Sequence, residues 1–104
     1  MTIIHEKLVR DRIPEIIQGS GKACSSRILT QDEYVAALDA KLQEELNEYQ
    51  ADKSMEELAD LLEVMMAVVE ARGHTFAEVE AIRQQKAAKR GGFHERIWLE
   101  SVSD

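Results

Sequence analysis

Three helix starts in this sequence share one four-residue pattern. Thr30, Ser54 and Thr75 each precede a glutamate by three positions. This is the spacing of a capping box, in which a hydroxyl and a carboxylate bind unpaired amides at the start of a helix. A stretch with helical apolar periodicity follows each start, and Gly73 and Gly91 supply stops after the second and third stretches. The helices predicted in this way cover about residues 31–51, 55–72 and 76–90.

A shorter helix is expected near the N-terminus, over about residues 12–18. Asp11 would cap its start, Pro14 is tolerated in its first turn, and Gly19 would end it.

Two further segments, residues 23–29 and 93–99, are expected to be extended. In the second segment Ile97 and Leu99 alternate with polar neighbours, which predicts a minor two-stranded ribbon. The expected fold class is therefore all-α: an antiparallel helical bundle of three main helices plus a short N-terminal helix, with this ribbon as a minor addition.

The composition is that of one small globular domain, residues 1–104. Lys and Arg number 13 and Asp and Glu number 20, so the net charge is −7 and nucleic acid is not expected as a partner. No apolar run approaches the roughly 20 residues that a membrane helix needs, so no membrane partner is expected. Cys24 is the single cysteine, which excludes an internal disulfide and predicts a reducing, cytoplasmic location.

The predicted helix at 55–72 is apolar on nearly every side. About 100 residues cannot cover such a helix completely, so we expect a second copy of the chain to cover the remainder. The protein is thus predicted to be a homo-oligomer, either a dimer or a tetramer. The apolar residues behind this prediction are Leu58, Leu61, Leu62, Val64, Met65, Met66, Val68 and Val69.

Four carboxylates are spaced so that they can meet between two helices. Glu45 and Glu48 are three residues apart on one predicted helix, and Glu57 and Asp60 have the same spacing on the next. The connection at 52–54 is short, so the two helices should be antiparallel. Counted outward from this turn, the two pairs lie at nearly the same height, because each residue adds about 1.5 Å of rise.

Carboxylates gathered in this way repel one another unless a cation neutralises them. Oxygen ligands without imidazole or thiolate favour Mg²⁺, with Mn²⁺ as the alternative. Glu45 also lies beside the apolar stripe of Leu42, Leu46 and Tyr49, where an unpaired carboxylate is costly. The spacing therefore predicts a carboxylate metal site.

Ordinary structural roles compete with this interpretation. Glu57 is also the capping-box partner of Ser54, and Glu44, Glu48 and Glu56 can be solvated residues of an acidic helix.

A basic face follows on the third main helix. Arg83, Lys86 and Arg90 are spaced i, i+3 and i+7, which places them on one side of that helix. They could form salt bridges with the acidic helices, or they could bind the phosphates of a metal–polyphosphate ligand. Gly91 and Gly92, which follow directly, permit close approach of a ligand or simply end the helix.

At these residues the chain resembles a known family. EELNE at 44–48 and ELAD at 57–60 resemble the EExxE…ExxD signature of the all-α, MazG-like nucleotide pyrophosphohydrolases. KLVRDRIPEII at 7–17 and KAAKRGGF at 86–93 resemble a small single-domain branch, described as predicted house-cleaning pyrophosphatases and similar to phosphoribosyl-ATP pyrophosphohydrolase. The resemblance extends from about residue 7 to residue 100.

The resemblance implies Mg²⁺-dependent cleavage of a nucleoside triphosphate between the α and β phosphates, giving a monophosphate and pyrophosphate. It implies that Glu44, as the acid that orients or deprotonates water, and Glu45 are catalytic. The implied metal ligands are Glu45, Glu48, Glu57 and Asp60. The substrate-binding candidates are Lys86, Arg90, Arg83, Lys7 and Arg10.

Two alternatives stay open at this point. One is hydrolysis of phosphoribosyl-ATP, and the other is a helical binding or adaptor module whose acidic cluster serves only metal-stabilised assembly.

Only eight residues separate Glu48 from Glu57, fewer than in many MazG-like proteins, so a loop that could close over the substrate is nearly absent.

Overall fold

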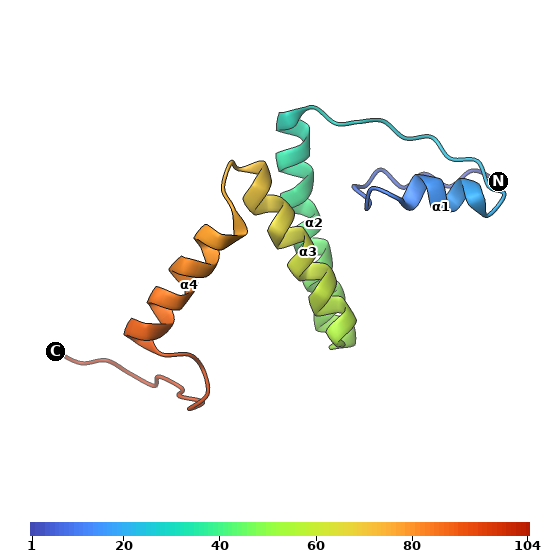
Figure 1. Ribbon diagram of the computed structural model, residues 1–104. Coiled ribbons are helices and arrows are strands. Elements are labelled where there is room, and N and C mark those ends of the chain that lie inside the picture. The colour runs from blue at the N-terminus through green and yellow to red at the C-terminus, as the bar shows by residue number, and fades with distance from the viewer. The chain divides into compact units, whose positions relative to one another are not determined.

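The computed structural model describes residues 1–104 and is helical, with no strands (Figure 1). Its four helices begin and end within one residue of the predicted positions. They are α1 (Ile13–Gly19), α2 (Gln31–Asp52), α3 (Met55–Ala71) and α4 (Phe76–Arg90). The segments 23–29 and 93–99 form no backbone ladder, so the predicted ribbon is wrong. Alternation at only two apolar positions does not specify a strand without a paired neighbour.

The ends of the helices show which caps form. Thr30 and Glu33 make a complete, reciprocal capping box at the start of α2. Ser54 and Thr75 each accept a hydrogen bond from the backbone amide three residues later, as predicted. The Asp11 cap is wrong, because α1 begins one residue later than expected and its N-cap residue, Arg12, makes no side-chain capping bond.

α2 and α3 form a tight antiparallel hairpin in which the two helices pack along each other (Figure 1). Only Lys53 and Ser54 connect them. Lys53 adopts a left-handed conformation with φ 62°, and its amide donates to the carbonyl of Tyr49 at 2.6 Å. The Lys53 ammonium also lies 5.6 Å from the centre of the Tyr49 ring, within the range of a cation–π contact. This connection sets the register between the two helices.

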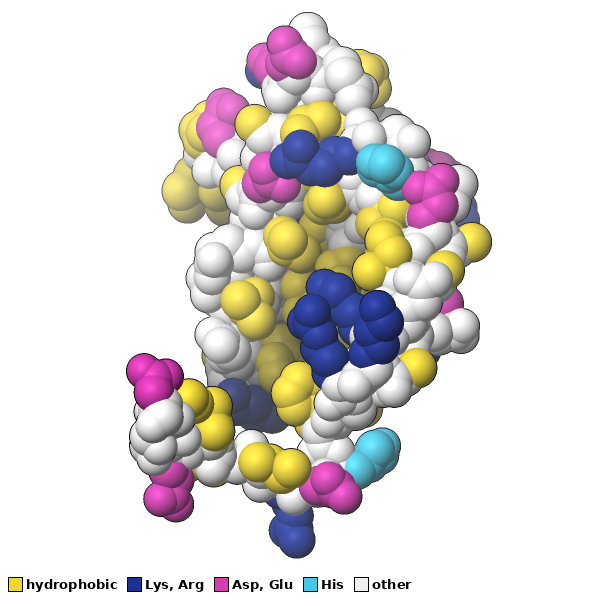
Figure 2. Space-filling view, turned by 90° about the vertical axis from the view of Figure 1, so that its left-hand side faces the viewer, with side chains coloured by type: hydrophobic (Ala, Val, Ile, Leu, Met, Phe, Trp, Pro, Cys, Tyr) yellow, Lys and Arg dark blue, Asp and Glu magenta, His cyan; other side chains and the backbone are white.

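The core between these helices is small. Leu38 and Val64 are its buried apolar residues. On α3, Leu58, Leu62 and Met65 are each more than a third exposed, although their spacing places them on one side of the helix. Hydrophobic side chains are accordingly visible at the surface (Figure 2). Oligomerisation through α3 stays a prediction that these exposed side chains motivate.

The chain divides into two compact units, Met1–His74 and Thr75–Asp104. The first contains α1, α2 and α3, and the second contains α4 and the C-terminal segment. The packing of α4 as the third helix of a bundle therefore stays a prediction, as does the single domain.

No helix has both the length and the apolar character needed to cross a membrane.

Candidate metal centre

The hairpin brings three of the four predicted metal ligands together. Glu45 from α2 and Glu57 and Asp60 from α3 each offer one carboxylate oxygen, and these oxygens all lie within 4.8 Å of one another. The short connection at Lys53 and Ser54 produces this meeting, since it places the last turns of α2 beside the first turns of α3.

Glu48, the fourth predicted ligand, belongs to a second group with Glu44 and Glu45 on α2 itself. The oxygens of this group also lie within 4.8 Å of one another. Glu45 is shared by the two groups. Glu48 is exposed and Glu44 is half-buried, so this side of the cluster is open to solvent.

Two oxygens of the cluster are buried without a partner. Glu45 is only 6% exposed, and neither its Oε2 atom nor the Oε2 atom of Glu57 has a hydrogen-bond partner. The predicted alternative role of Glu57 is not realised, because the reciprocal carboxylate bond that completes the capping box at Thr30 is absent at Ser54. A buried carboxylate oxygen without a partner is costly, and a bound cation would remove that cost.

Lys41 was not identified from the sequence as part of this site. Its ammonium lies 3.2 Å from Glu45 Oε1 and 3.4 Å from Glu44 Oε1, and its side chain is only 17% exposed. Burial acts to lower the pKa of Lys41, but the ion pairs with Glu45 and Glu44 outweigh burial and raise it. The spacing i, i+4 from Lys41 to Glu45 is the signal that could have revealed this pair.

Burial raises the pKa of Glu45 above its ordinary value. The ion pair with Lys41 opposes this rise, and the neighbouring Glu48 carboxylate adds to it. Lys41 therefore neutralises one oxygen of Glu45 and leaves the other available on the side of Glu57 and Asp60.

Arg10 reaches the same cluster from the N-terminal segment. Its Nη2 atom lies 2.7 Å from Asp60 Oδ1 and donates a hydrogen bond to it, and its Nη1 atom lies 3.8 Å from Glu63 Oε1. The sequence predicted Arg10 as a substrate-binding residue. The structure places it against one of the predicted metal ligands, a contact that nothing in the local sequence pattern reveals, and its role in substrate binding stays a prediction.

The donor set fits Mg²⁺ or Mn²⁺. All donors are carboxylate oxygens, which are the ligands that hard divalent cations prefer, and no histidine or cysteine belongs to either group. The residues that could hold such an ion are Glu45, Glu57 and Asp60, with Glu48 beside them.

The other predicted substrate-binding residues are Arg83, Lys86, Arg90 and Lys7. Arg83 forms a two-pronged ion pair with Glu80 on its own helix, with Nε 2.9 Å from Glu80 Oε2. Lys86 and Arg90, also on α4, are exposed and form no salt bridge, and Lys7 is likewise exposed. α4 belongs to the second unit, so the facing of these bases toward the carboxylates stays a prediction.

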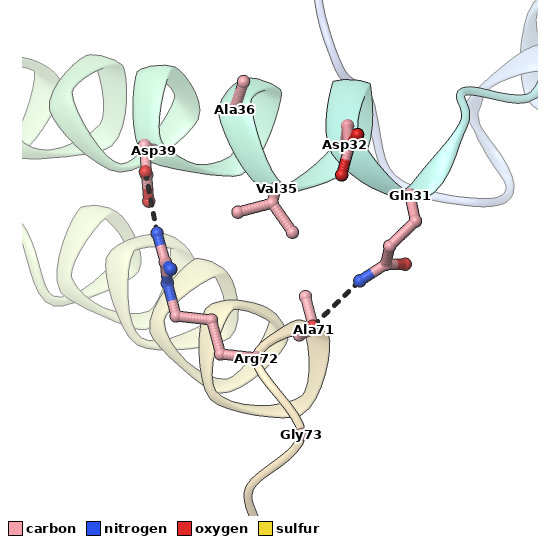
Figure 3. Close-up of a pocket in the computed structure, with 8 residues that line it drawn as sticks. All are labelled: Gln31, Asp32, Val35, Ala36, Asp39, Ala71, Arg72 and Gly73. Carbon is pink, nitrogen blue, oxygen red and sulfur yellow. Dashed lines mark hydrogen bonds and ion pairs between the residues drawn. The ribbon is translucent and has the colours of Figure 1, made fainter.

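A separate groove of about 680 Å³ lies at the opposite end of the hairpin (Figure 3). Two side chains close the hairpin there: Gln31 donates to the carbonyl of Ala71 at 2.9 Å, and Arg72 pairs with Asp39 at 3.1 Å. Because these two contacts join the start of α2 to the end of α3, we assign the groove a structural role in holding the two helices together. It is lined by Gln31, Asp32, Val35, Ala36, Asp39, Ala71, Arg72 and Gly73.

Comparison with known proteins identifies a relative of unassigned role. No protein-family model and no solved structure matches the chain. A protein of Mycolicibacterium smegmatis (strain ATCC 700084 / mc(2)155), described as uncharacterized, is 60% identical over 45 residues. The match covers 43% of this chain and 46% of the relative, so it spans about half the length of that protein.

Proposed function

We propose that this protein is a Mg²⁺-dependent nucleotide pyrophosphohydrolase of the MazG-like type, with Mn²⁺ as an alternative ion. In this proposal it cleaves a nucleoside triphosphate between the α and β phosphates, releasing a monophosphate and pyrophosphate. One observation carries the proposal: Glu45 and Glu57 each hold a buried carboxylate oxygen without a partner, next to Asp60.

Each acidic residue has a distinct part in this proposal. Glu45, Glu57 and Asp60 hold the cation between α2 and α3, and Glu48 adds a ligand on the open side of Glu45. When bound, the cation neutralises phosphate charge and lowers the pKa of a coordinated water. Lys41 keeps one oxygen of Glu45 neutralised, which limits the repulsion among the carboxylates before the substrate arrives.

Glu44 is the residue proposed to orient the attacking water and accept its proton. Its side chain is 35% exposed, so water reaches it, and its ion pair with Lys41 restrains its position. Phosphoanhydride hydrolysis needs an in-line water and charge neutralisation and little covalent chemistry from the protein. The combination of a cation site and an adjacent exposed carboxylate meets these needs.

The phosphates also need cationic contacts from the protein. Lys86 and Arg90 suit this role because both are exposed without an ion-pair partner, whereas Arg83 would have to leave Glu80 first. Lys7 is a further exposed candidate. We propose non-standard nucleotides as the substrates, cleared in the cytoplasm by a homo-oligomer of this chain.

The test is release of pyrophosphate from a panel of nucleotides with and without Mg²⁺. The panel contains standard and modified nucleoside triphosphates and phosphoribosyl-ATP, and chromatography identifies the second product. We expect a monophosphate and pyrophosphate, and no turnover after removal of Mg²⁺ with EDTA. A diphosphate product, or no turnover of any panel member with Mg²⁺, would contradict the proposal.

Two variants locate the activity. Glu45→Gln should abolish turnover, because it removes charge from the buried residue shared by both carboxylate groups. Glu56→Gln is the matched control, since Glu56 is an exposed acid on the same helix as Glu57 and belongs to neither group. Loss of activity in both variants would indicate that turnover depends on the overall negative charge of the protein rather than on this site.

A further inference from the structure

The contact between Arg10 and Asp60 joins the N-terminal segment to the carboxylate cluster. Fifty positions separate the two residues, and the hydrogen bond between them is 2.7 Å long. The same guanidinium lies 3.8 Å from Glu63, one turn further along α3. Both acids are partly exposed, so this contact is open to ions from solution.

Asp60 thus has two competing roles in one place. It belongs to the oxygen group with Glu45 and Glu57, and it also accepts a hydrogen bond from the Arg10 guanidinium. A divalent cation bound by this group would share the Asp60 carboxylate with the positive charge of Arg10. Two positive charges on one carboxylate repel each other and compete for its negative charge.

We propose that Arg10 is a competing counter-ion that sets the cation affinity of the site: it holds Asp60 in the cation-free protein and leaves Asp60 when a divalent cation binds. Release of Arg10 frees the segment at residues 7–12 from α3. This inference rests on the metal centre of the proposed function, but not on the hydrolytic reaction.

The competition has a direction that separates it from a supporting role. If Arg10 only positioned Asp60 for the cation, its removal would weaken cation binding. In the competing role its removal strengthens binding. Arg12 provides a matched control, because it lies two residues away, carries the same charge and pairs only with Glu15 at 3.4 Å.

The experiment measures Mn²⁺ binding by calorimetry, without nucleotide, for the unaltered protein, Arg10→Gln, Arg10→Lys and Arg12→Gln. We expect Arg10→Gln to bind Mn²⁺ about two- to fivefold more tightly, the range that a partly exposed ion pair supports. Arg10→Lys should fall between it and the unaltered protein, since an ammonium keeps the charge but not the two-pronged reach. Arg12→Gln should change the affinity by less than Arg10→Gln.

A second measurement follows the N-terminal segment directly. Addition of Mg²⁺ should shift the backbone amide resonances of residues 7–12 together with those around Asp60, and the shifts at 7–12 should disappear in Arg10→Gln. Unchanged resonances at residues 7–12 during Mg²⁺ binding would overturn the inference.

Three outcomes of the Mn²⁺ titrations would contradict the inference about Arg10. Equal or weaker Mn²⁺ binding by Arg10→Gln, an equal gain in Arg12→Gln, or no Mn²⁺ binding by any variant would each overturn the competing role. The proposed hydrolysis is tested separately. Mn²⁺ binding with the expected order of affinities, but without release of pyrophosphate from any nucleotide, would contradict the proposed hydrolysis and leave the role of Arg10 intact.

Discussion

Glu45 on α2 and Glu57 on α3 meet across the helical hairpin, and each keeps one buried carboxylate oxygen without a hydrogen-bond partner. Neither helix creates this arrangement alone, because it depends on the packing of one helix against the other. Binding of a cation to the cluster should therefore stabilise the hairpin, and this effect can be measured without any knowledge of the substrate.

Removal of the Glu57 charge should uncouple stability from divalent cations. In the unaltered protein, Mg²⁺ at about 100 times its dissociation constant should add about 2.7 kcal/mol to the free energy of unfolding. Glu57→Gln should lose most of this gain while remaining folded, whereas Glu56→Gln, at the exposed neighbouring position, should keep it. Urea unfolding in EDTA and in Mg²⁺ measures the difference, and identical curves for the unaltered protein would contradict the prediction.

Substitution of Lys41 should destabilise the protein, because the buried Glu45 carboxylate then lacks its ion-pair partner. Lys41→Met removes the ammonium that pairs with Glu45 Oε1 and should destabilise the cation-free protein by about 1–3 kcal/mol. Mg²⁺ should recover part of this loss, because it supplies another positive charge. Lys22→Met is the control, since Lys22 is exposed and forms no salt bridge. Equal stability of the two variants in EDTA would show that the ion pair contributes nothing.

Lowering the pH should destabilise the N-terminus of α2, because Glu33 becomes protonated. Hydrogen bonds from Arg27 and from the backbone amide of Thr30 lower the pKa of Glu33 to about 2. A pKa below its unfolded value means that the stabilisation is complete above about pH 4.5 and is lost as the pH falls toward 2. The stability difference between the unaltered protein and Glu33→Gln should therefore shrink from pH 6 to pH 3.

Chemical denaturation at these two pH values checks the prediction. Asp32→Asn is a suitable comparison, because Asp32 lies in the same first turn without an ion pair to Arg27. A stability difference for Glu33→Gln that stays constant with pH would refute the assigned role of the Arg27 pair.

Arg90 should matter for turnover and little for folding. A charge-assisted contact to phosphate contributes about 1.5–3 kcal/mol, so Arg90→Ala should lower kcat/KM by about 10- to 150-fold. Lys86→Ala should have a similar effect, and Arg90→Lys should restore only part of the rate, because an ammonium lacks the two-pronged geometry. Gln85→Ala, at an exposed position of α4 outside the basic face, serves as control. An active enzyme insensitive to the loss of Arg90 and Lys86 would mean that other residues bind the phosphates.

The exposed stripe on α3 should control assembly. Leu62 is 46% exposed between Leu58 and Met65, so a charge there tests an interface without entering the buried core. Leu62→Glu should dissociate the predicted dimer or tetramer in light scattering, whereas Gln50→Glu, which adds the same charge at an exposed polar position of α2, should not. A folded monomer in the unaltered protein would contradict the interface.

The helices could be predicted because their signals are local. Thr30, Ser54 and Thr75 mark starts with hydroxyl caps that the structure contains, and glycines at positive φ, such as Gly73 and Gly91, follow the ends. The antiparallel pairing of α2 with α3 followed from the short connection. The ribbon failed because strand formation depends on a distant partner that no local pattern specifies.

The candidate site could be predicted only in part for the same reason. Regular helical spacing, combined with the short connection between the helices, was enough to predict that Glu45, Glu57 and Asp60 meet. The release of Glu57 from its capping role depends on which bonds form at the folded helix end. The contact between Arg10 and Asp60 spans fifty positions and follows no helical period, so the sequence alone did not reveal it.

The two-residue connection at Lys53 and Ser54 also restricts how this chain can change in length. One residue inserted into α3 ahead of Glu57 would rotate every later position by about 100° and shift it by about 1.5 Å, which would turn Glu57 and Asp60 away from Glu45. Insertions after Ala71, beyond the end of α3, would leave the three carboxylates where they are. A single-residue insertion in the helical turns that carry Glu45, Glu57 and Asp60 should therefore be tolerated less well than one near the chain ends.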